Sequence, residues 1–298
     1  MTNSPTISQL TPAQIETDAL LQAVNDRISF HTFNANDRDI IQRVISEGLG
    51  DTRGVVRLHA AQILGEIGEP ATGLLVEALL HNPNVTIRRA TAKTLALIED
   101  PTSVPALLEA FLTDEDTVVH GSSVGALARI GNVAVPALIE IIADTDRSET
   151  TKGHAAWALA FIGNEAAEHL YPALQHDSID VRCAVVSAIA HVAQEKGVEQ
   201  ACQVLVDSLT DPAAVIRNEA AAALSQINYP PAIPHLIAAT QDSDGEVRKA
   251  AVSSLGKVGD ESAIAPLQAA LNDELEVVRV LAKLALQQLE NRLPGDFP

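Results

Sequence analysis

Aromatic side chains are scarce in this chain of 298 residues: phenylalanine, tyrosine and tryptophan make up 3% of it, with a single tryptophan. Hydrophobic residues nonetheless reach 47%, so the core has to consist of alanine, leucine, isoleucine and valine, which let helices pack closely. Only two cysteines occur, Cys183 and Cys202, and their spacing gives no disulfide framework. These shortages argue against a small disulfide-bonded fold.

Basic residues are also few. The formal net charge is −19, which argues against nucleic acid as a partner, because binding a phosphate backbone requires lysine and arginine patches. No apolar run approaches the ~20 residues of a membrane-spanning helix. The N-terminal sequence lacks the basic and apolar regions of a signal peptide. We therefore expect a cytoplasmic protein that binds no membrane.

Motifs of common enzyme sites are missing as well. The sequence contains no P-loop and no G-x-G-x-x-G motif. Its nine histidines are scattered, and none forms the His-Glu dipeptide that a di-iron centre between paired helices would need. We expect neither a metal nor a prosthetic group.

The chain does contain an internal repeat. A mostly acidic position is followed six residues later by a basic one eight times, and successive copies are separated by 30 to 35 residues. The basic positions are Arg57, Arg88, His120, Lys152, Arg182, Arg217, Arg248 and Arg279, and the early positions are Asp51, Asn82, Asp114, Asp146, His176, Asp211, Asp242 and Asp273. Such a fixed period indicates one helical hairpin copied and stacked, because a single copy cannot bury its own apolar face.

The repeat predicts an all-α fold, a right-handed α-solenoid of about eight short helical hairpins with no strand. We expect a disordered tip over 1–10, a single repeat domain over 11–292 and a tail over 293–298. Thr11 and Gln14 form a capping-box pattern for a first helix that reaches about Asn25. Prolines are expected in the first turn of five outer helices, at Pro105, Pro136, Pro172, Pro234 and Pro266. Each basic residue of the repeat should reach a carboxylate of a neighbouring copy.

The pattern D-x-x-x-V-R-x-x-A-x-x-x-L-G-x-I-G is typical of short HEAT-like repeats. Its period near 31 residues is shorter than the ~40 of most such repeats and resembles that of the E/F-type phycobilin lyases of cyanobacteria. The segment KGHAAWALAFIG is similar to members of that family that attach phycoerythrobilin to phycoerythrin. The resemblance covers nearly the whole chain.

The resemblance implies a bilin lyase. Such an enzyme holds a linear tetrapyrrole, here phycoerythrobilin as substrate, and joins it by a thioether bond to a cysteine of a phycobiliprotein subunit, here phycoerythrin β. A second lyase or chaperone chain is a possible partner. The alternative is a non-catalytic HEAT-repeat chaperone or adaptor of phycobiliproteins or of the phycobilisome, because the same fold serves both classes.

The copies differ at the positions that lie 1, 2, 5 and 9 residues after each basic residue. These positions are expected to line the concave groove of the solenoid. The fourth copy places His154, Trp157 and Phe161 there, and the third copy places Arg129. We expect Trp157 and Phe161 to stack on the pigment rings. Arg129, Arg89 and Lys93 are expected to bind its propionates, and His154, Asp146 or Glu149 its pyrrole nitrogens. A local plug of the core is the alternative for Trp157.

Three residues are candidates for the chemistry. His154 and His191 are expected to assist proton transfer, and Cys183 is a candidate for holding the pigment transiently. A free cysteine is, however, more often a small buried hydrophobic residue, and no sequence feature marks Cys183 as a thiolate. The replacement of arginine by His120 and Lys152 is either drift or a loss of rigidity that makes room for a site.

Overall fold

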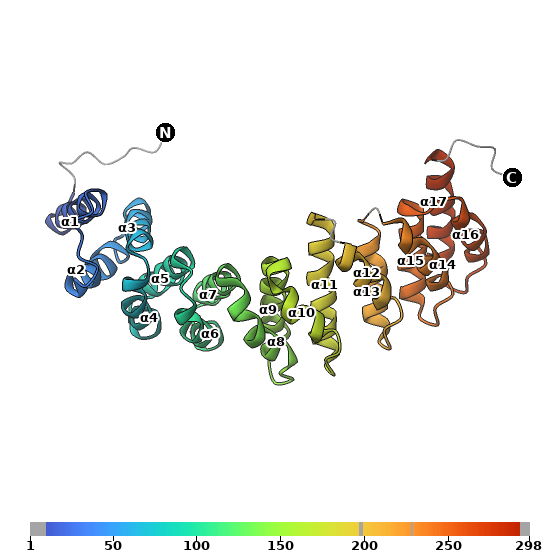
Figure 1. Ribbon diagram of the computed structural model, residues 1–298, viewed down its shortest axis with the longest axis horizontal. Helices are drawn as coiled ribbons and strands as arrows, with labels where there is room; N and C mark the ends of the chain where they lie inside the picture. The colour runs from blue at the N-terminus through green and yellow to red at the C-terminus, as the bar shows by residue number, and fades with distance from the viewer. Residues whose placement is uncertain (1–9, 197–198, 228, 293–298) are drawn as a thin grey trace. The chain divides into compact units, whose positions relative to one another are not determined.

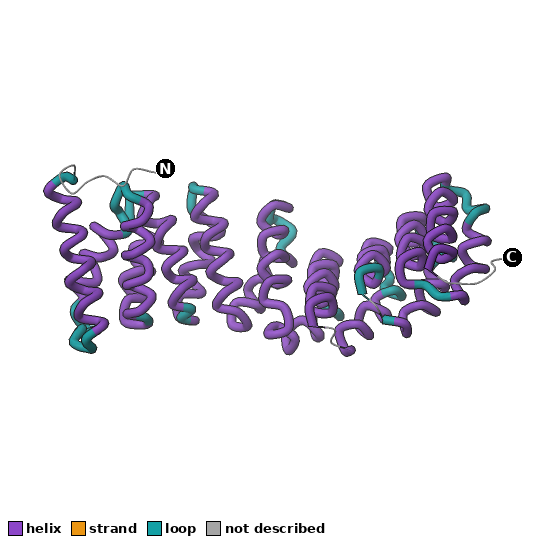
Figure 2. Tube along the Cα trace, turned by 90° about the horizontal axis from the view of Figure 1, so that it is seen from above, coloured by secondary structure: helices purple, strands orange, loops and turns teal. Residues whose placement is uncertain are grey.

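The computed structural model describes residues 10–196, 199–227 and 229–292. This part of the chain consists of helices and short connections without a strand (Figure 2). It divides into two compact units, residues 1–134 and 135–298. The expected single domain over 11–292 and the handedness of the solenoid therefore stay predictions. The expected tail over 293–298 and all but the last residue of the tip lie outside the described residues.

The first unit is a stack of antiparallel helix pairs preceded by one helix (Figure 1). Its helices are α1 (Pro12–Ser29), α2 (Arg38–Arg43), α3 (Gly54–Ile67), α4 (Thr72–His81), α5 (Val85–Ile98), α6 (Val104–Thr113) and α7 (Thr117–Ile130). A π-helical turn, Val44–Gly48, extends α2. The inner helices α3, α5 and α7 pack against one another in order.

The second unit repeats the same plan. Its helices are α8 (Val135–Ala143), α9 (Glu149–Ile162), α10 (Ala167–Ala173), α11 (Ile179–Lys196), α12 (Glu199–Ser208), α13 (Ala214–Leu224), α14 (Ile233–Ala239), α15 (Gly245–Val258), α16 (Ile264–Ala270) and α17 (Glu276–Arg292). Inner helices α9, α11, α13, α15 and α17 pack in sequence. With α2/α3, α4/α5 and α6/α7 in the first unit, the described residues form the expected number of about eight hairpins.

Local sequence signals place most of the helix ends. The capping box at Thr11 is confirmed, with both reciprocal hydrogen bonds to Gln14, although α1 continues beyond Asn25 to Ser29. Gly68 ends α3 with a φ of 74°, a conformation that costs little only for glycine. One proline differs from expectation: Pro172 lies in the last turn of the short helix α10 rather than in its first. It removes a single helical hydrogen bond there.

The core is the predicted small-residue core. The position three residues after each basic residue is buried in every copy, for example at Ala60 on α3 and Ala155 on α9. The position seven residues after it is a leucine or isoleucine, such as Leu127 on α7, which is fully buried. Each inner helix therefore presents one continuous apolar stripe to its neighbours, as the 3.6-residue period requires.

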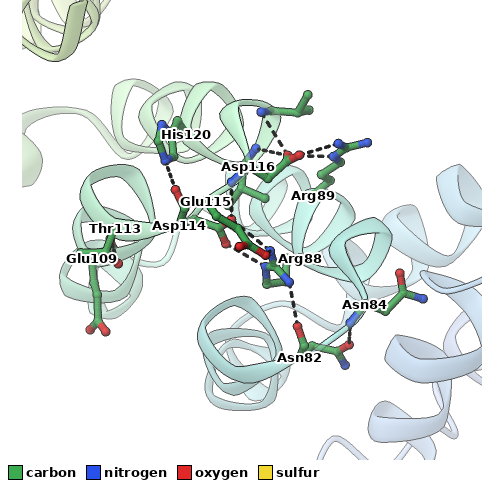
Figure 3. A network of polar contacts seen from close by, with 12 residues as sticks. Asn82, Asn84, Arg88, Arg89, Glu109, Thr113, Asp114, Glu115, Asp116 and His120 are labelled. Carbon is green, nitrogen blue, oxygen red and sulfur yellow. Dashed lines mark hydrogen bonds and ion pairs between the residues drawn. The ribbon is translucent and has the colours of Figure 1, made fainter.

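As expected, four arginines of the repeat link consecutive copies through a carboxylate, whereas Arg57, His120 and Arg279 make no such link within the described residues. Arg217 donates from Nη1 to the carbonyl oxygen of Asp211 in its own copy, at 2.9 Å. Its Nε and Nη2 donate to both carboxylate oxygens of Asp242 in the next copy, each at 2.7 Å. The same arrangement joins Arg88 to Asp114, Arg182 to Asp211 and Arg248 to Asp273. Figure 3 shows the Arg88 example, with Asn82 on one side of the guanidinium and Asp114 on the other.

The carboxylates serve a second purpose in their own copy. Asp242 accepts a hydrogen bond from the backbone N–H of Asp244, which fixes the turn before α15. In the fourth copy this position is filled by Asp144, whose carboxylate accepts from the N–H of Asp146. The assignment of Asp146 to the early position is therefore wrong: the turn before α9 is longer, and an acidic residue stands six positions before Lys152 by coincidence.

The two unusual basic residues behave differently from each other. Lys152 is buried and keeps a link to the next copy through an ion pair with Asp180 at 2.6 Å. His120 contacts the carbonyl oxygen of Asp114 in its own copy (Figure 3). Lys152 therefore retains the linking role of the arginines, and the replacement does not loosen α9 from α11.

The ion pairs between the basic residues and the carboxylates of the next copy form a ladder along the repeats. This ladder predicts that the stability of the fold depends on pH in the acidic range. The Arg217 guanidinium holds the pKa of Asp242 below its ordinary value, and Arg248 does the same for Asp273. A carboxylate whose pKa is lower in the folded state stabilises the fold above its unfolded pKa of about 3.9, and this stabilisation is lost as the pH falls through the folded pKa. We expect the urea midpoint of unfolding, followed by circular dichroism, to change little between pH 7 and 5 and to fall below about pH 4. An unchanged urea midpoint at pH 3 would contradict a contribution of these ion pairs to the free energy of unfolding.

One stretch of the described residues, 117–143, is long and apolar enough to cross a membrane by composition. It consists of two helices, α7 and α8, joined by a 3-10 turn over Gly131–Ala134, and half of it is buried inside the protein. A segment of this kind is what a helical core requires, so it is weak support for a membrane span.

Candidate functional site

An exposed aromatic pair lies on α9. The helix begins after Ser148, whose side chain accepts a hydrogen bond from the N–H of Thr151, and it ends at Gly163 with a φ of 61°. Trp157 and Phe161 are one helical turn apart, and their ring centroids are 5.6 Å apart at an angle of 32°. Both are more than half exposed, at 52% and 55%. Trp157 is therefore not a plug of the core, and that alternative is wrong.

His154 extends this aromatic face by one turn toward the N-terminus of α9, and it is exposed as well. The neighbouring inner helix, α11, packs against α9 and carries Cys183 and His191. His191 is exposed near the end of α11, whereas Cys183 is half-buried near its beginning. The second unit thus contains the stacking residues and the three candidates for chemistry on two adjacent helices.

The surroundings of Cys183 disfavour a nucleophilic thiolate. Burial raises the pKa of its thiol, and the carboxylates of Glu219 and Asp180 raise it further. The reactive form of cysteine is the thiolate, and reactive cysteines are found near positive charge. At neutral pH the Cys183 thiol is protonated, which favours the structural role.

This assignment makes a prediction for Cys183→Ser. We expect a variant that folds and attaches pigment to its client at a rate within about twofold of the wild type, because the substitution nearly preserves the volume of the side chain. Attachment of pigment to a co-expressed client, measured by zinc-enhanced fluorescence of the denatured subunit, checks it. A loss of more than tenfold with normal circular dichroism would restore the covalent role.

The expected acceptors for the pyrrole nitrogens lie in the turn before α9 and at the first residue of that helix. Asp146 and Glu149 are both exposed, and Glu149 lies 3.9 Å from the ammonium group of Lys152. Within the described residues neither carboxylate is bound by arginine, so both have oxygen atoms that can accept from a pyrrole N–H.

The three expected cations lie in the first unit, and two of them already have acidic partners. Arg129 is ion-paired with Glu99. Arg89 donates from Nε to Asp116 at 2.8 Å and holds the pKa of that carboxyl well below its usual range (Figure 3). Lys93 is exposed and makes no ion pair within the part of the chain that the structure describes. Of the expected propionate ligands, only Lys93 is therefore uncommitted.

The sequence reasoning missed a cavity of the first unit. It lies at the N-terminal ends of α3 and α5 and has a volume of about 830 Å³. Leu58, Leu97 and Val118 give it an apolar lining, and Arg57, Arg89 and Lys93 also line it. The sequence did contain a signal for the state of Arg57, which lines it: Asn82 replaces aspartate at the position that would pair with Arg57.

Among the described residues, no group of three or more histidine, cysteine, aspartate or glutamate side chains is arranged to hold a metal ion.

The comparisons with known proteins agree with this architecture. The sequence profile of HEAT repeats matches overlapping segments that together span residues 41–287. The bilin biosynthesis protein MpeU of Synechococcus sp. (strain WH8020) is 34% identical over 94% of both chains. The chain belongs to the E/F-type phycobilin lyase family.

Other relatives of this phycobilin lyase family member share the fold. The deoxyhypusine hydroxylase of Eremothecium gossypii is 25% identical over 83% of this chain and 76% of that protein. A crystal structure of a Kap121p mutant superposes with a TM-score of 0.56 at 12% identity, covering 94% of this chain and 36% of that one. These likenesses concern the HEAT-repeat fold alone.

Proposed function

We propose that the chain is a bilin lyase that binds a linear tetrapyrrole and attaches it to a cysteine of a phycobiliprotein subunit. The pigment in this proposal is phycoerythrobilin and the client is phycoerythrin β, in the cytoplasm. Membership of the phycobilin lyase family supports the reaction class. The observation that carries the site is the exposed Trp157–Phe161 pair, since two large aromatic rings are left open to solvent in a chain that has few.

The aromatic face suits a conjugated ligand. A pyrrole ring stacked on Trp157 would cover apolar surface that is otherwise in contact with water, and offset stacking adds about 0.5–1.5 kcal/mol to that burial. Ligands that are both flat and apolar gain the most from such a surface. His154 lies one turn away on the same helix, within the region that a tetrapyrrole of several rings would cover.

The reaction is an addition and needs no oxidant or leaving group. The client thiol forms a carbon–sulfur bond with the exocyclic ethylidene carbon of ring A, and the double bond of that group is lost. The thiol proton is removed and a proton is delivered to the ring carbon that carried the double bond. In the proposal His154 and His191 carry out these transfers, and the enzyme otherwise acts by holding the pigment and the thiol in register.

Co-expression tests this function directly. The chain is produced with enzymes that make phycoerythrobilin and with a phycoerythrin β subunit, and the purified subunit is examined for pigment that survives denaturation. Covalent fluorescent pigment that depends on the chain supports the lyase. Free pigment bound to the chain without transfer would contradict it.

The second candidate is an adaptor or chaperone of phycobiliproteins, and the same aromatic pair favours it. Tryptophan and other aromatic side chains are frequent at the centres of protein interfaces. In this case the chain would bind the β subunit in pull-down experiments, Trp157→Ala would weaken that binding, and no covalent pigment would appear.

A further inference from the structure

Among the ladder arginines that are followed by another copy, Arg57 is the one that reaches no carboxylate of that copy within the described residues. Its Nη1 donates to the carbonyl oxygens of Asp51 and Thr52, at 2.7 and 3.0 Å, as the other ladder arginines do in their own copies. The position of the next copy that holds Asp114 opposite Arg88 is Asn82 opposite Arg57. Within the described residues, Nε and Nη2 of Arg57 make no hydrogen bond and no ion pair. Two donors of a guanidinium fork are thus available.

The other charges around the cavity are largely neutralised. Asp51 also lines it, but its carboxylate is bound by Arg53 at 2.8 Å and is almost fully buried. Arg89 is held by Asp116. Arg57 and Lys93 remain as positive groups on the wall of one cavity, in a protein whose formal net charge is −19.

The remaining lining is apolar. Leu58, Leu97 and Val118 are exposed large hydrophobic residues, and all three face this cavity. Its volume of about 830 Å³ lies within the usual range of roughly 300–1,000 Å³ for small-molecule sites, which typically combine an apolar lining with a few polar groups.

We propose that this cavity binds an apolar molecule that carries a carboxylate group. The Arg57 guanidinium and the Lys93 ammonium group bind that carboxylate. Arginine binds a carboxylate with two parallel hydrogen bonds, and Nε and Nη2 of Arg57 are the pair that the equivalent Arg88 uses for Asp114. In the proposal the ligand supplies from the cavity the carboxylate that Arg57 lacks. The inference rests on the proposed function only in taking the linear tetrapyrrole, with its two propionates, as the ligand class.

The test compares two probes with the same rings. Biliverdin carries two free propionates, and biliverdin dimethyl ester carries none. We expect the full-length protein to bind biliverdin at least about tenfold more tightly than the ester in fluorescence-quenching titrations, the size of one charge-assisted hydrogen bond. Arg57→Gln and Lys93→Gln should each reduce this preference, and the double variant should remove it.

Asn82→Asp provides the most specific variant, because it replaces the side-chain amide at the ladder position by a carboxylate of the same size and shape. We expect it to engage Arg57, to leave the fold intact by circular dichroism, and to lower the preference for the acid to about that of Arg57→Gln. Asn272→Asp, an exposed residue of the second unit, changes the net charge equally and should bind both probes as the wild type does.

Equal binding of the two probes by the wild type would overturn the carboxylate site, and so would Asn82→Asp and Arg57→Gln variants that keep the full preference. The outcome is separate from that of the lyase. If the protein binds biliverdin more tightly than the ester but attaches no pigment to the client, the carboxylate site is supported and the lyase function is rejected. If it attaches pigment but binds both probes equally, the lyase function is supported and the carboxylate site is rejected.

Discussion

Trp157→Ala is expected to abolish detectable attachment of pigment while leaving the helical circular dichroism spectrum and the thermal midpoint unchanged. Its side chain is 52% exposed and makes its ring contact with Phe161, so its removal leaves no cavity in the core. Covering roughly 100 Å² of indole surface contributes about 2.5 kcal/mol at 25 cal/mol per Å². Loss of that term weakens pigment binding by roughly 70-fold.

Two further variants make this result specific. Trp157→Phe keeps a ring and should retain a measurable part of the attachment rate. Val280→Ala removes a similarly exposed apolar side chain from α17 and should have no effect. If Trp157→Ala lowers the thermal midpoint by several degrees, Trp157 supports the fold, and if attachment continues at the wild-type rate, the aromatic pair is not the pigment surface.

Arg217→Ala is expected to destabilise the second unit strongly. Arg217 and Asp242 are 14% and 11% exposed in their side chains and are joined by two hydrogen bonds of 2.7 Å. Removing one partner of a buried pair leaves the other charge without compensation, at a cost of about 3 kcal/mol. Urea unfolding followed by circular dichroism should show a lower midpoint than that of the wild type.

Arg57→Ala is the matched control, because Arg57 occupies the same position in its copy and makes only the bonds to backbone carbonyl oxygens. Its cost should be about 1 kcal/mol, the net value of ordinary hydrogen bonds. Equal losses in the two variants would show that the link to the next copy adds nothing and that the carbonyl bonds alone explain the recurrence of arginine.

The fold was largely predictable because a single repeat period in the sequence specifies every helical hairpin. The six-residue spacing proved to be the separation at which Arg217 donates to the carbonyl oxygen of Asp211. The repeat period brings the carboxylate of Asp242, 25 residues further along the chain, to the same guanidinium. The six-residue spacing rule selected the wrong residue where the length of the turn changed. Asp146 met the spacing rule, but Asp144 fills the structural position, since a longer turn precedes α9.

The candidate site was predictable in part. The period of α9 placed Trp157 and Phe161 on one outward face, and the structure puts their rings in contact. The state of the cations was not predictable, because it depends on acidic residues of other helices. Arg89 is neutralised by Asp116 and Arg129 by Glu99, residues about one repeat away in sequence. Conversely, Asn82 was visible as an exception to the acidic series, but its effect on Arg57 follows only from the geometry of the regular copies.

The missing bridge at Arg57 also bears on the cooperativity of the first unit. On one side of it, Arg53 ties Asp18 of α1 to Asp51 before α3. On the other, Arg88 ties α5 to the hairpin that follows. In a linear stack whose stability is a sum of neighbouring interfaces, the boundary between α3 and α5 then lacks the charged link that the boundaries on either side of it have. The carboxylate cavity lies across that same boundary. A bound ligand would therefore act as a removable coupling between repeats, and this end of the chain would become more rigid as its cargo is loaded and looser as it is released.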